Sequence, residues 1–422
     1  MIAATGSGEL LFTPRVGAQY GNALLWALIL AVTLKWFINR EVGRFAVCTG
    51  APVLEGFRRL PGPRNWAVWL IVVPQVVVAV ATVAGLAGAG ATAVILLVPG
   101  PAELWMPLLT AGSAALVLWG HYYGVEVTAK VVAVALGIAA IAAAASVFPG
   151  VRPVAAGLMP TIPAQSDASE ILAWLGFMLS GAAGMIWYSY WLPAKGYGAG
   201  RPDNGHLPTD AHALGTDDRG RLRGWLQQLT FDNTVAVVGG LVIALAFLVL
   251  GTELLRPKGL VPEEQKVAEV LGRLLGEVWG PIGFWFMVGA ILVGFWCTTL
   301  SVQDGFGRLL AHGAVILLEP AGLKGRWRDE KFWRAAFLIG LLTVLPVIVY
   351  LIVGEPVGLL KLAGVIKVAH IPVIAGLTLY LNRRALPPEL RPSRVAFGMT
   401  TLAGLFFATF AVLVILPLLS TG

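Results

Sequence analysis

The chain has 422 residues, of which 57% are hydrophobic and only 13% are charged. Soluble globular domains carry about 25% charged residues, so this composition excludes an ordinary soluble protein. The formal net charge of +7 does not indicate nucleic-acid binding, because the basic residues lie in loops between apolar runs rather than on one polar surface.

A helix needs about 20 apolar residues to span the hydrocarbon core of a bilayer, and the chain offers about eleven runs near or above that length. We expect an all-α integral membrane protein whose helices form a single transmembrane domain over residues 1–422. The expected segments are 2–17, 22–45, 66–97, 104–121, 129–148, 171–192, 231–251, 281–311, 331–353, 357–381 and 395–418. No sizeable soluble domain and no cleavable signal peptide are expected.

The first segment is interrupted by Gly6, Ser7 and Gly8, and a carboxylate follows at Glu9. A charge at the bilayer centre costs about 2.5–3.5 kcal/mol on insertion scales, so it usually faces a cavity or a partner. A broken helix that carries a carboxylate is typical of a transporter's substrate site. The alternative is that Glu9 only caps the restarted half-helix. The stretch before Gly6 is shorter than the about ten residues that cross half of the core, so we expect translation to begin upstream of Met1.

Basic residues follow every even-numbered segment. They lie within 40–64, 195–223, 324–334 and 383–394, with Lys130 alone after the fourth segment. By the positive-inside rule these loops are cytoplasmic, which places the N-terminus inside and the C-terminus outside the cytoplasmic membrane. The loop 193–230 is the most polar stretch and is rich in turn formers, so we expect a mobile cytoplasmic connection there.

The sixth segment carries a second candidate break at Gly181-Ala-Ala-Gly-Met185. Two interrupted helices five segments apart are typical of an inverted five-plus-five repeat. We expect repeat one at about 1–148, repeat two at about 171–381, and an extra helix at about 395–418. Small residues crowd 84–93, which indicates close helix packing rather than a nucleotide-binding loop.

Lys367 and His370 lie near the middle of the tenth segment and share one helix face. Lys367 is about 15 Å from either helix end, which is far for its ammonium group to reach the membrane surface. We hypothesise that Lys367 pairs with Glu9 or acts as a fixed cation in place of a coupled ion; the alternative is that it reaches a water-filled cavity. His370 is either a proton carrier or a satisfied core histidine. We expect Lys35 to snorkel or to pair locally.

Motifs spread over most of the chain resemble those of one known family. The matching stretches are Gly17-Ala-Gln-Tyr-Gly21, Leu24-Leu-Trp26, Arg44–Gly50 with its final Cys-Thr-Gly, 263–310, Ile371-Pro-Val and Asn382–Pro392. Together they look like an Nramp-type divalent-metal transporter. The resemblance implies a LeuT-like fold with broken first and sixth helices, working by alternating access.

The resemblance also implies a ligand set. Aligned without a gap, the family's Asp-Pro-Gly-Asn motif falls on residues 6–9, so its Asp ligand becomes Gly6 and its Asn ligand becomes Glu9. In the sixth segment the family's Ala carbonyl matches Ala182 and its Met ligand matches Met185. These four residues are then expected to contact the substrate, with Glu9 and Met185 as metal ligands, since a thioether selects against hard ions. Met185 as core filler is the alternative.

The residues after Met185 depart from the family. Its Pro and His become Ile186 and Trp187, and the lost His is a residue linked to proton movement in the family, which puts proton coupling in doubt. Trp187 and Tyr188 either wall the vestibule or pack in the interior. Thr298 and hydroxyls near it on the eighth segment either line an ion path or bond between helices.

The sequence thus predicts an Nramp-related secondary transporter that moves a divalent metal ion across the cytoplasmic membrane. The metal ion is cargo, no cofactor is expected, and the bilayer is the partner, with neither nucleic acid nor an obligate protein partner. An alternative cargo is an amino acid or other small organic ion, because half-helix N-termini and Lys367 suit a carboxylate. An enzyme is not favoured, because no HExxH, CxxC, phosphate-loop or nucleophile motif occurs.

Overall fold

The computed structural model describes residues 8–120, 123–164, 166–179, 181–199, 209–319 and 325–420. Gly6, one of the expected substrate contacts, lies outside these residues. Every regular element in the described ranges is helical, as the apolar periodicity predicts. Nine of the described helices are long and apolar enough to cross a membrane. The second expected segment corresponds to a helix over residues 25–49, and the described part of the first corresponds to the helical residues 8–20. The described helices therefore follow the predicted succession of spans.

The described part of the chain starts with a wide π-helical turn, η2 (Gly8–Phe12), that runs directly into α1. The helices that follow are α1 (Thr13–Tyr20), α2 (Leu25–Thr49), α3 (Val53–Arg58), α4 (Trp66–Leu97), α5 (Ala102–Trp119) and α6 (Tyr123–Ser146). The short helix α7 (Val151–Ala156) precedes the broken pair α8 (Ala168–Phe177) and α9 (Ala182–Ala194).

The rest of the chain is again helical. Its main elements are α10 (Thr216–Leu250), η4 (Gly251–Leu255), α11 (Val267–Leu318), α12 (Glu330–Ala336), η9 (Phe337–Val344), α13 (Leu345–Val353), α14 (Pro356–Ala385) and α15 (Arg394–Ser420). The expected external helix and the eighth span form one element, α11, which kinks at Gly280. Gly280 has φ +65°, a left-handed conformation that favours glycine, and Pro281 follows it.

The expected loop 193–230 is shorter than the sequence suggested. Helix α9 continues to Ala194, and α10 begins at Thr216, so residues 216–230 are helical rather than part of a mobile connection. Asp217 and Asp218 lie in the first turn of α10, where carboxylates interact favourably with the helix dipole. These two aspartates indicate a helix start, which the abundance of turn-forming residues in 193–230 outweighed in the sequence-based prediction.

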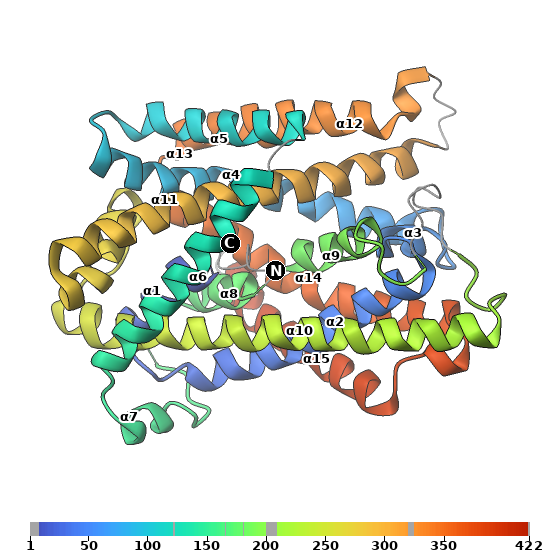
Figure 1. The fold of residues 1–422 in the computed structure, drawn as a ribbon, viewed down its shortest axis with the longest axis horizontal. Coiled ribbons are helices and arrows are strands. Elements are labelled where there is room, and N and C mark those ends of the chain that lie inside the picture. Colours follow the sequence, from blue (N-terminus) through green and yellow to red (C-terminus); the bar gives the residue numbers. More distant parts are fainter. Residues whose placement is uncertain are drawn as a thin grey trace.

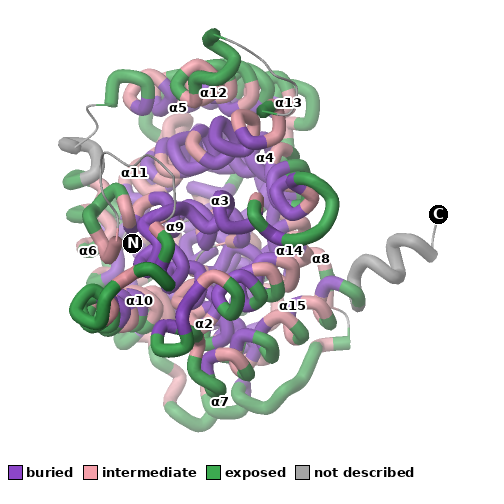
Figure 2. The backbone as a smooth tube through the Cα atoms, turned by 90° about the vertical axis from the view of Figure 1, so that its right-hand side faces the viewer, coloured by how far each residue is buried: buried purple, intermediate pink, exposed green. Residues whose placement is uncertain are grey.

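The helices form two outer groups around a buried centre. Figure 1 shows α4, α5, α11, α12 and α13 on one side, α2, α10 and α15 on the other, and α8, α9 and α14 between them. In Figure 2 the buried residues gather along the central elements, while α5, α12 and α13 expose much of their surface. Large apolar side chains are exposed on these outer helices, such as Ile352 at 78%, as expected for surfaces that face lipid.

Glycines set the closest helix contacts around the centre. A Cβ on Gly364 of α14 would lie 2.5 Å from Ala173 Cα of α8, so the two backbones touch directly. Gly85 and Gly88 of α4 similarly admit Leu360 and Tyr350. The small-residue stretch 84–93 therefore does what its composition predicted, which is to let membrane helices approach closely.

Candidate substrate site

The sixth expected span is broken, a few residues before the predicted position. Helix α8 ends at Phe177 and α9 restarts at Ala182, so residues 182–185 of the expected break at Gly181–Met185 are helical. Between them Leu179 has φ +58°, a left-handed backbone conformation that is uncommon for a residue other than glycine. Unwound backbone at membrane depth is tolerated only where protein or water surrounds it, so this break marks a functional region.

The start of the first span packs against this break. Gly8 lies so close to α8 that a Cβ there would be 2.7 Å from the Phe177 carbonyl oxygen. Trp174 Nε1 donates to Thr13 Oγ1 at 3.0 Å, which fixes α8 against α1. The Glu9 carboxylate is 1% exposed, and its Oε1 accepts a hydrogen bond from the Leu179 backbone N–H at 2.7 Å. The first and sixth spans therefore meet at their irregular segments.

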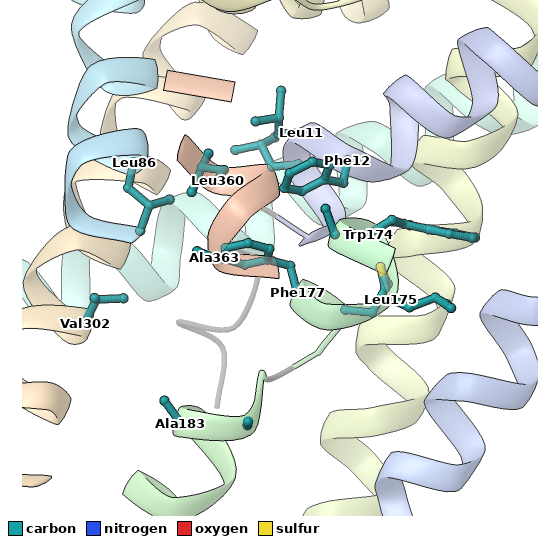
Figure 3. Close-up of a cluster of buried hydrophobic side chains, with 14 of the residues drawn as sticks. Leu11, Phe12, Leu86, Trp174, Leu175, Phe177, Ala183, Val302, Leu360 and Ala363 are labelled. Atoms are coloured by element: carbon teal, nitrogen blue, oxygen red, sulfur yellow. The ribbon is translucent and has the colours of Figure 1, made fainter. Parts of the chain in front are cut away.

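A cavity of about 190 Å³ lies beside the break. Its walls come from α2, α4, α8, α9, α10, α11 and α14, which bring distant parts of the sequence together. Figure 3 shows four apolar wall residues: Leu86 of α4 and Val302 of α11 on one side, and Phe177 of α8 and Ala183 of α9 on the other. Its polar wall residues include Lys35, Asn39, Asn233, Thr298, Ser301 and Lys367.

The predicted site residues divide into two groups. Trp187 and Tyr188 line the cavity, and Trp187 also packs edge-on against Phe306 with ring centroids 4.7 Å apart. Ala182 and Met185 are fully buried in the apolar core and do not line the cavity.

Two further predicted residues stay outside the cavity wall. Glu9 is not part of it, although its Leu179 partner is. His370 is buried as well, and its Nδ1 lies 2.6 Å from Gln75 Nε2, whereas its Nε2 has no hydrogen-bond partner of normal geometry in the described ranges, so only one ring nitrogen is satisfied.

Lys35 occupies a position that the sequence did not reveal. Its side chain is buried, and Nζ donates to the carbonyl oxygens of Leu175 at 2.6 Å and Met178 at 2.8 Å, with Gly176 at 3.5 Å. These carbonyls form the C-terminal end of α8, where the helix dipole is negative. Lys35 therefore neither snorkels to the surface nor pairs along its own helix. Its charge at mid-span was the available signal, but its partners lie about 140 positions away in sequence.

Lys367 reaches the same cavity from α14. It is 5% exposed, and its Nζ lies 3.5 Å from the centroid of the Phe177 ring, a close cation–π contact. The expected ion pair with Glu9 is not formed within the described part of the chain, where no carboxylate or carbonyl oxygen lies within hydrogen-bonding distance of Lys367 Nζ. The role of fixed cation that was expected of Lys367 fits Lys35 better.

The electrostatics of the cavity are positive. Both charged residues in its wall are lysines, and no aspartate or glutamate in the described ranges contributes to the wall. Within those ranges no three His, Cys, Asp or Glu side chains are grouped so that they could hold a metal ion. A divalent ion in this cavity would find hydroxyl, amide and backbone oxygens but no counter-charge.

An ion network around the buried Glu170 carboxylate joins α1, α8 and α14. Arg15 of α1 forms a two-pronged pair with Glu170 of α8, at 2.7 and 2.9 Å, and also donates to the Pro262 carbonyl. Lys361 of α14 joins Glu170 at 2.6 Å and Asp167 at 3.4 Å. Burial alone would raise the pKa of Asp167, but hydrogen bonds within this turn and the charge of Lys361 bring it below its ordinary value. We call Arg15, Glu170 and Lys361 the seal.

The comparisons with known proteins agree with this architecture. The family model described as "Natural resistance-associated macrophage protein-like" (Nramp) matches residues 1–417. An uncharacterized protein of Pasteurella multocida (strain Pm70) is 25% identical over 390 residues, which cover 90% of this chain and 82% of the relative.

Solved transporter structures share the fold. A mutant of the Eremococcus coleocola manganese transporter superposes with a TM-score of 0.70 at 14% identity, covering 98% of this chain and 83% of that one. MhsT in complex with L-phenylalanine gives 0.55 at 16% identity, with 98% and 96% coverage. The inward-facing form of Mhp1 gives 0.53 at 12% identity, with 98% and 90% coverage. The predicted LeuT-like fold is confirmed, and the chain belongs to the Nramp family of membrane transporters.

Proposed function

We propose that this protein is a secondary transporter that moves a divalent metal ion across the cytoplasmic membrane by alternating access. Family membership over residues 1–417 and the fold shared with a manganese transporter support the metal cargo. The observation that carries the transport role is the cavity at the α8–α9 break, because transporters bind cargo where discontinuous helices meet near the bilayer midplane.

The seal and the cavity suggest which side is closed. The seal joins α1, α8 and α14 through residues at the starts of α8 and α14. The cavity wall continues the other way, along α2 and α9 to Asn39 and Trp191. Asn39 adjoins the basic stretch 40–64, which the positive-inside rule places in the cytoplasm. We therefore propose that this conformation is closed to the outside, and that cargo leaves towards the cytoplasm.

The proposed metal ligands are Glu9, the Ala182 carbonyl and Met185. None of them lines the cavity, so metal binding requires η2 and the start of α9 to move relative to each other. Glu9 would exchange its hydrogen bond with the Leu179 N–H for the ion. A site with a carboxylate and a thioether favours a transition metal such as Mn²⁺ over a harder ion, because a thioether binds hard ions poorly.

Metal uptake by purified protein in liposomes tests this function. The wild type is expected to take up Mn²⁺, and Glu9→Gln, which removes the only charged ligand, is expected to lose that uptake. Glu103→Gln changes an exposed glutamate on α5 and is expected to transport normally. Mn²⁺ uptake that survives in Glu9→Gln would remove Glu9 from the site, and wild-type protein that moves no divalent ion would remove the metal cargo. A pH gradient across the same liposomes reports whether protons are coupled.

A second candidate cargo is an amino acid or other small organic ion. The specific observation in its favour is the charge of the cavity, whose wall in the described ranges carries two lysines and no carboxylate. Such a wall attracts anions and repels divalent cations. The same liposomes loaded with a labelled organic acid distinguish this cargo from a bare metal ion.

A further inference from the structure

The Lys367 ammonium group lacks an oxygen partner in the described structure. Lys367 is 5% exposed and lines the cavity, and its ammonium group contacts the face of the Phe177 ring. Burying a charge without a hydrogen-bonded partner is expensive. A buried cation of this kind indicates a site that an anion completes.

The N-terminus of α9 adjoins the same ammonium group. Gly181 is the N-cap residue of α9 and has no side chain to cap the helix, and the first backbone N–H groups of a helix have no partner inside it. The Lys367 side chain runs directly over this end, since a Cβ on Gly181 would lie 2.6 Å from Lys367 Cδ. Gly181, Ala183 and Gly184 all belong to the cavity wall. Uncapped N–H groups and the positive end of the dipole form an anion site.

Lys35 strengthens the field without competing for the ligand. Its Nζ is held by carbonyls at the end of α8, yet its side chain also belongs to the cavity wall. Two lysines beside a half-helix N-terminus, with no acidic wall residue in the described ranges, favour an anion in this cavity.

The size of the cavity favours a molecule over a bare ion. Its volume of about 190 Å³ exceeds that of an engineered cavity of about 150 Å³ that binds benzene. Much of the remaining wall is apolar and aromatic, with Leu86, Phe177 and Trp187. A cargo that satisfies both parts of the wall has a compact negative group and a small organic body.

We propose that this cavity binds a small organic carboxylate, with the carboxylate between Lys367 Nζ and the N–H groups of α9. The proposal rests on the transporter function above and names the cargo class of that site. A carboxylate arrives either as the free acid or as an acid that chelates a divalent metal ion. The second source would let an Nramp transporter with a cationic cavity still move metal.

Calorimetric binding to the purified full-length protein tests the proposal. The probes are L-glutamate, L-malate and citrate, each with and without MnCl₂, and MnCl₂ alone. Wild-type protein is expected to bind at least one of the acids. Lys367→Gln removes a charge-assisted hydrogen bond and is expected to weaken that binding by about tenfold to a hundredfold. Lys367→Arg keeps the charge and is expected to retain more affinity than the glutamine variant.

A matched variant and a folding measurement complete the test. Lys195→Gln makes the same change at an exposed lysine at the end of α9 and is expected to bind like the wild type. Thermal unfolding without ligand is expected to show Lys367→Gln at least as stable as the wild type, because a buried cation without an oxygen partner is removed. The acid is then expected to raise the unfolding temperature of the wild type but not of this variant.

The outcomes separate this proposal from the metal-transport proposal. Binding of an acid equally with and without Mn²⁺ identifies the free acid as cargo, and binding only with Mn²⁺ identifies the chelate. Failure of all three acids to bind, or equal binding by wild type and Lys367→Gln, overturns the carboxylate site. If the carboxylate site is overturned in this way and Mn²⁺ uptake is the same in wild type and Lys367→Gln, the metal-transport proposal is kept without the carboxylate site. Acid binding without any uptake into liposomes instead refutes transport.

Discussion

The ammonium group of Lys35 fills a cradle of backbone carbonyls, and its removal is the most informative perturbation of this fold. Lys35 Nζ donates to Leu175 O at 2.6 Å and to Met178 O at 2.8 Å, just where α8 ends and the chain unwinds. Half-helix C-termini and unwound carbonyls coordinate monovalent cations in transporters of related design. We therefore interpret Lys35 as a tethered cation that replaces a soluble one.

The expected cost of Lys35→Ala follows from these contacts. A hydrogen bond to a charged group contributes about 1.5–3 kcal/mol, so two short ones contribute about 3–6 kcal/mol. These values already include the cost of desolvation, so the net expectation is a loss of about 3–6 kcal/mol in the free energy of unfolding.

The assay is thermal unfolding of purified protein in NaCl and in N-methylglucamine chloride at equal ionic strength. Wild-type protein is expected to unfold at the same temperature in both salts, because its cradle is already occupied. Lys35→Ala is expected to be less stable in N-methylglucamine and to recover in NaCl, since Na⁺ can enter the empty cradle. At a Na⁺ concentration a hundred times its dissociation constant, Na⁺ binding stabilises the variant by about 2.7 kcal/mol.

The control is Lys195→Ala, which removes an exposed lysine and is expected to show neither effect. The interpretation fails if Lys35→Ala is as stable as the wild type in N-methylglucamine. It fails equally if the variant is destabilised but Na⁺, K⁺ and N-methylglucamine give the same unfolding temperature, because the carbonyls would then not form a cation site. A sodium requirement in the wild type would likewise contradict it.

Two further predictions concern the seal and the helix contacts. Glu170→Gln removes the buried carboxylate that binds Arg15 and Lys361, and it is expected to cost about 3–5 kcal/mol of stability. Asp167→Asn, at the partly exposed edge of the seal, is expected to cost less than about 1 kcal/mol. Thermal unfolding compares the two variants, and equal losses would contradict the role of the seal. Gly364→Ala drives a methyl group into the α8 backbone and is expected to lower the free energy of unfolding by about 1–3 kcal/mol or more. Gly376→Ala on the same helix places its methyl group in open space and is expected to raise the free energy of unfolding by up to about 1 kcal/mol. Chemical denaturation measures both glycine variants, and matching midpoints would show that the α8–α14 contact is looser than the structure has it.

Local features of the sequence were sufficient for the membrane class, the succession of spans and the existence of a break in the sixth span, but they put that break a few residues too late. Hydrophobic length is read against a fixed bilayer thickness, so each span can be identified without knowing its neighbours. The family motifs outside the ligand positions were sufficient for the LeuT-like fold. Polar composition was a poorer guide in 193–230, because it cannot distinguish a loop from the solvated start of a long helix such as α10.

The site itself depended on how helices pack. Sequence reasoning placed a carboxylate at the centre and left Lys367 to pair with it, to act as a fixed cation or to reach a cavity. The structure directs Glu9 to the Leu179 N–H and places Lys367 in the cavity wall. It also directs the Lys35 ammonium group to the carbonyl oxygens at the end of α8. These outcomes follow from the rotation of each helix about its axis and from backbone contacts between residues far apart in the chain, such as Ala173 and Gly364. Composition and spacing determine that charges lie within the membrane, whereas only tertiary packing decides which of them meet and therefore what sign the cavity has.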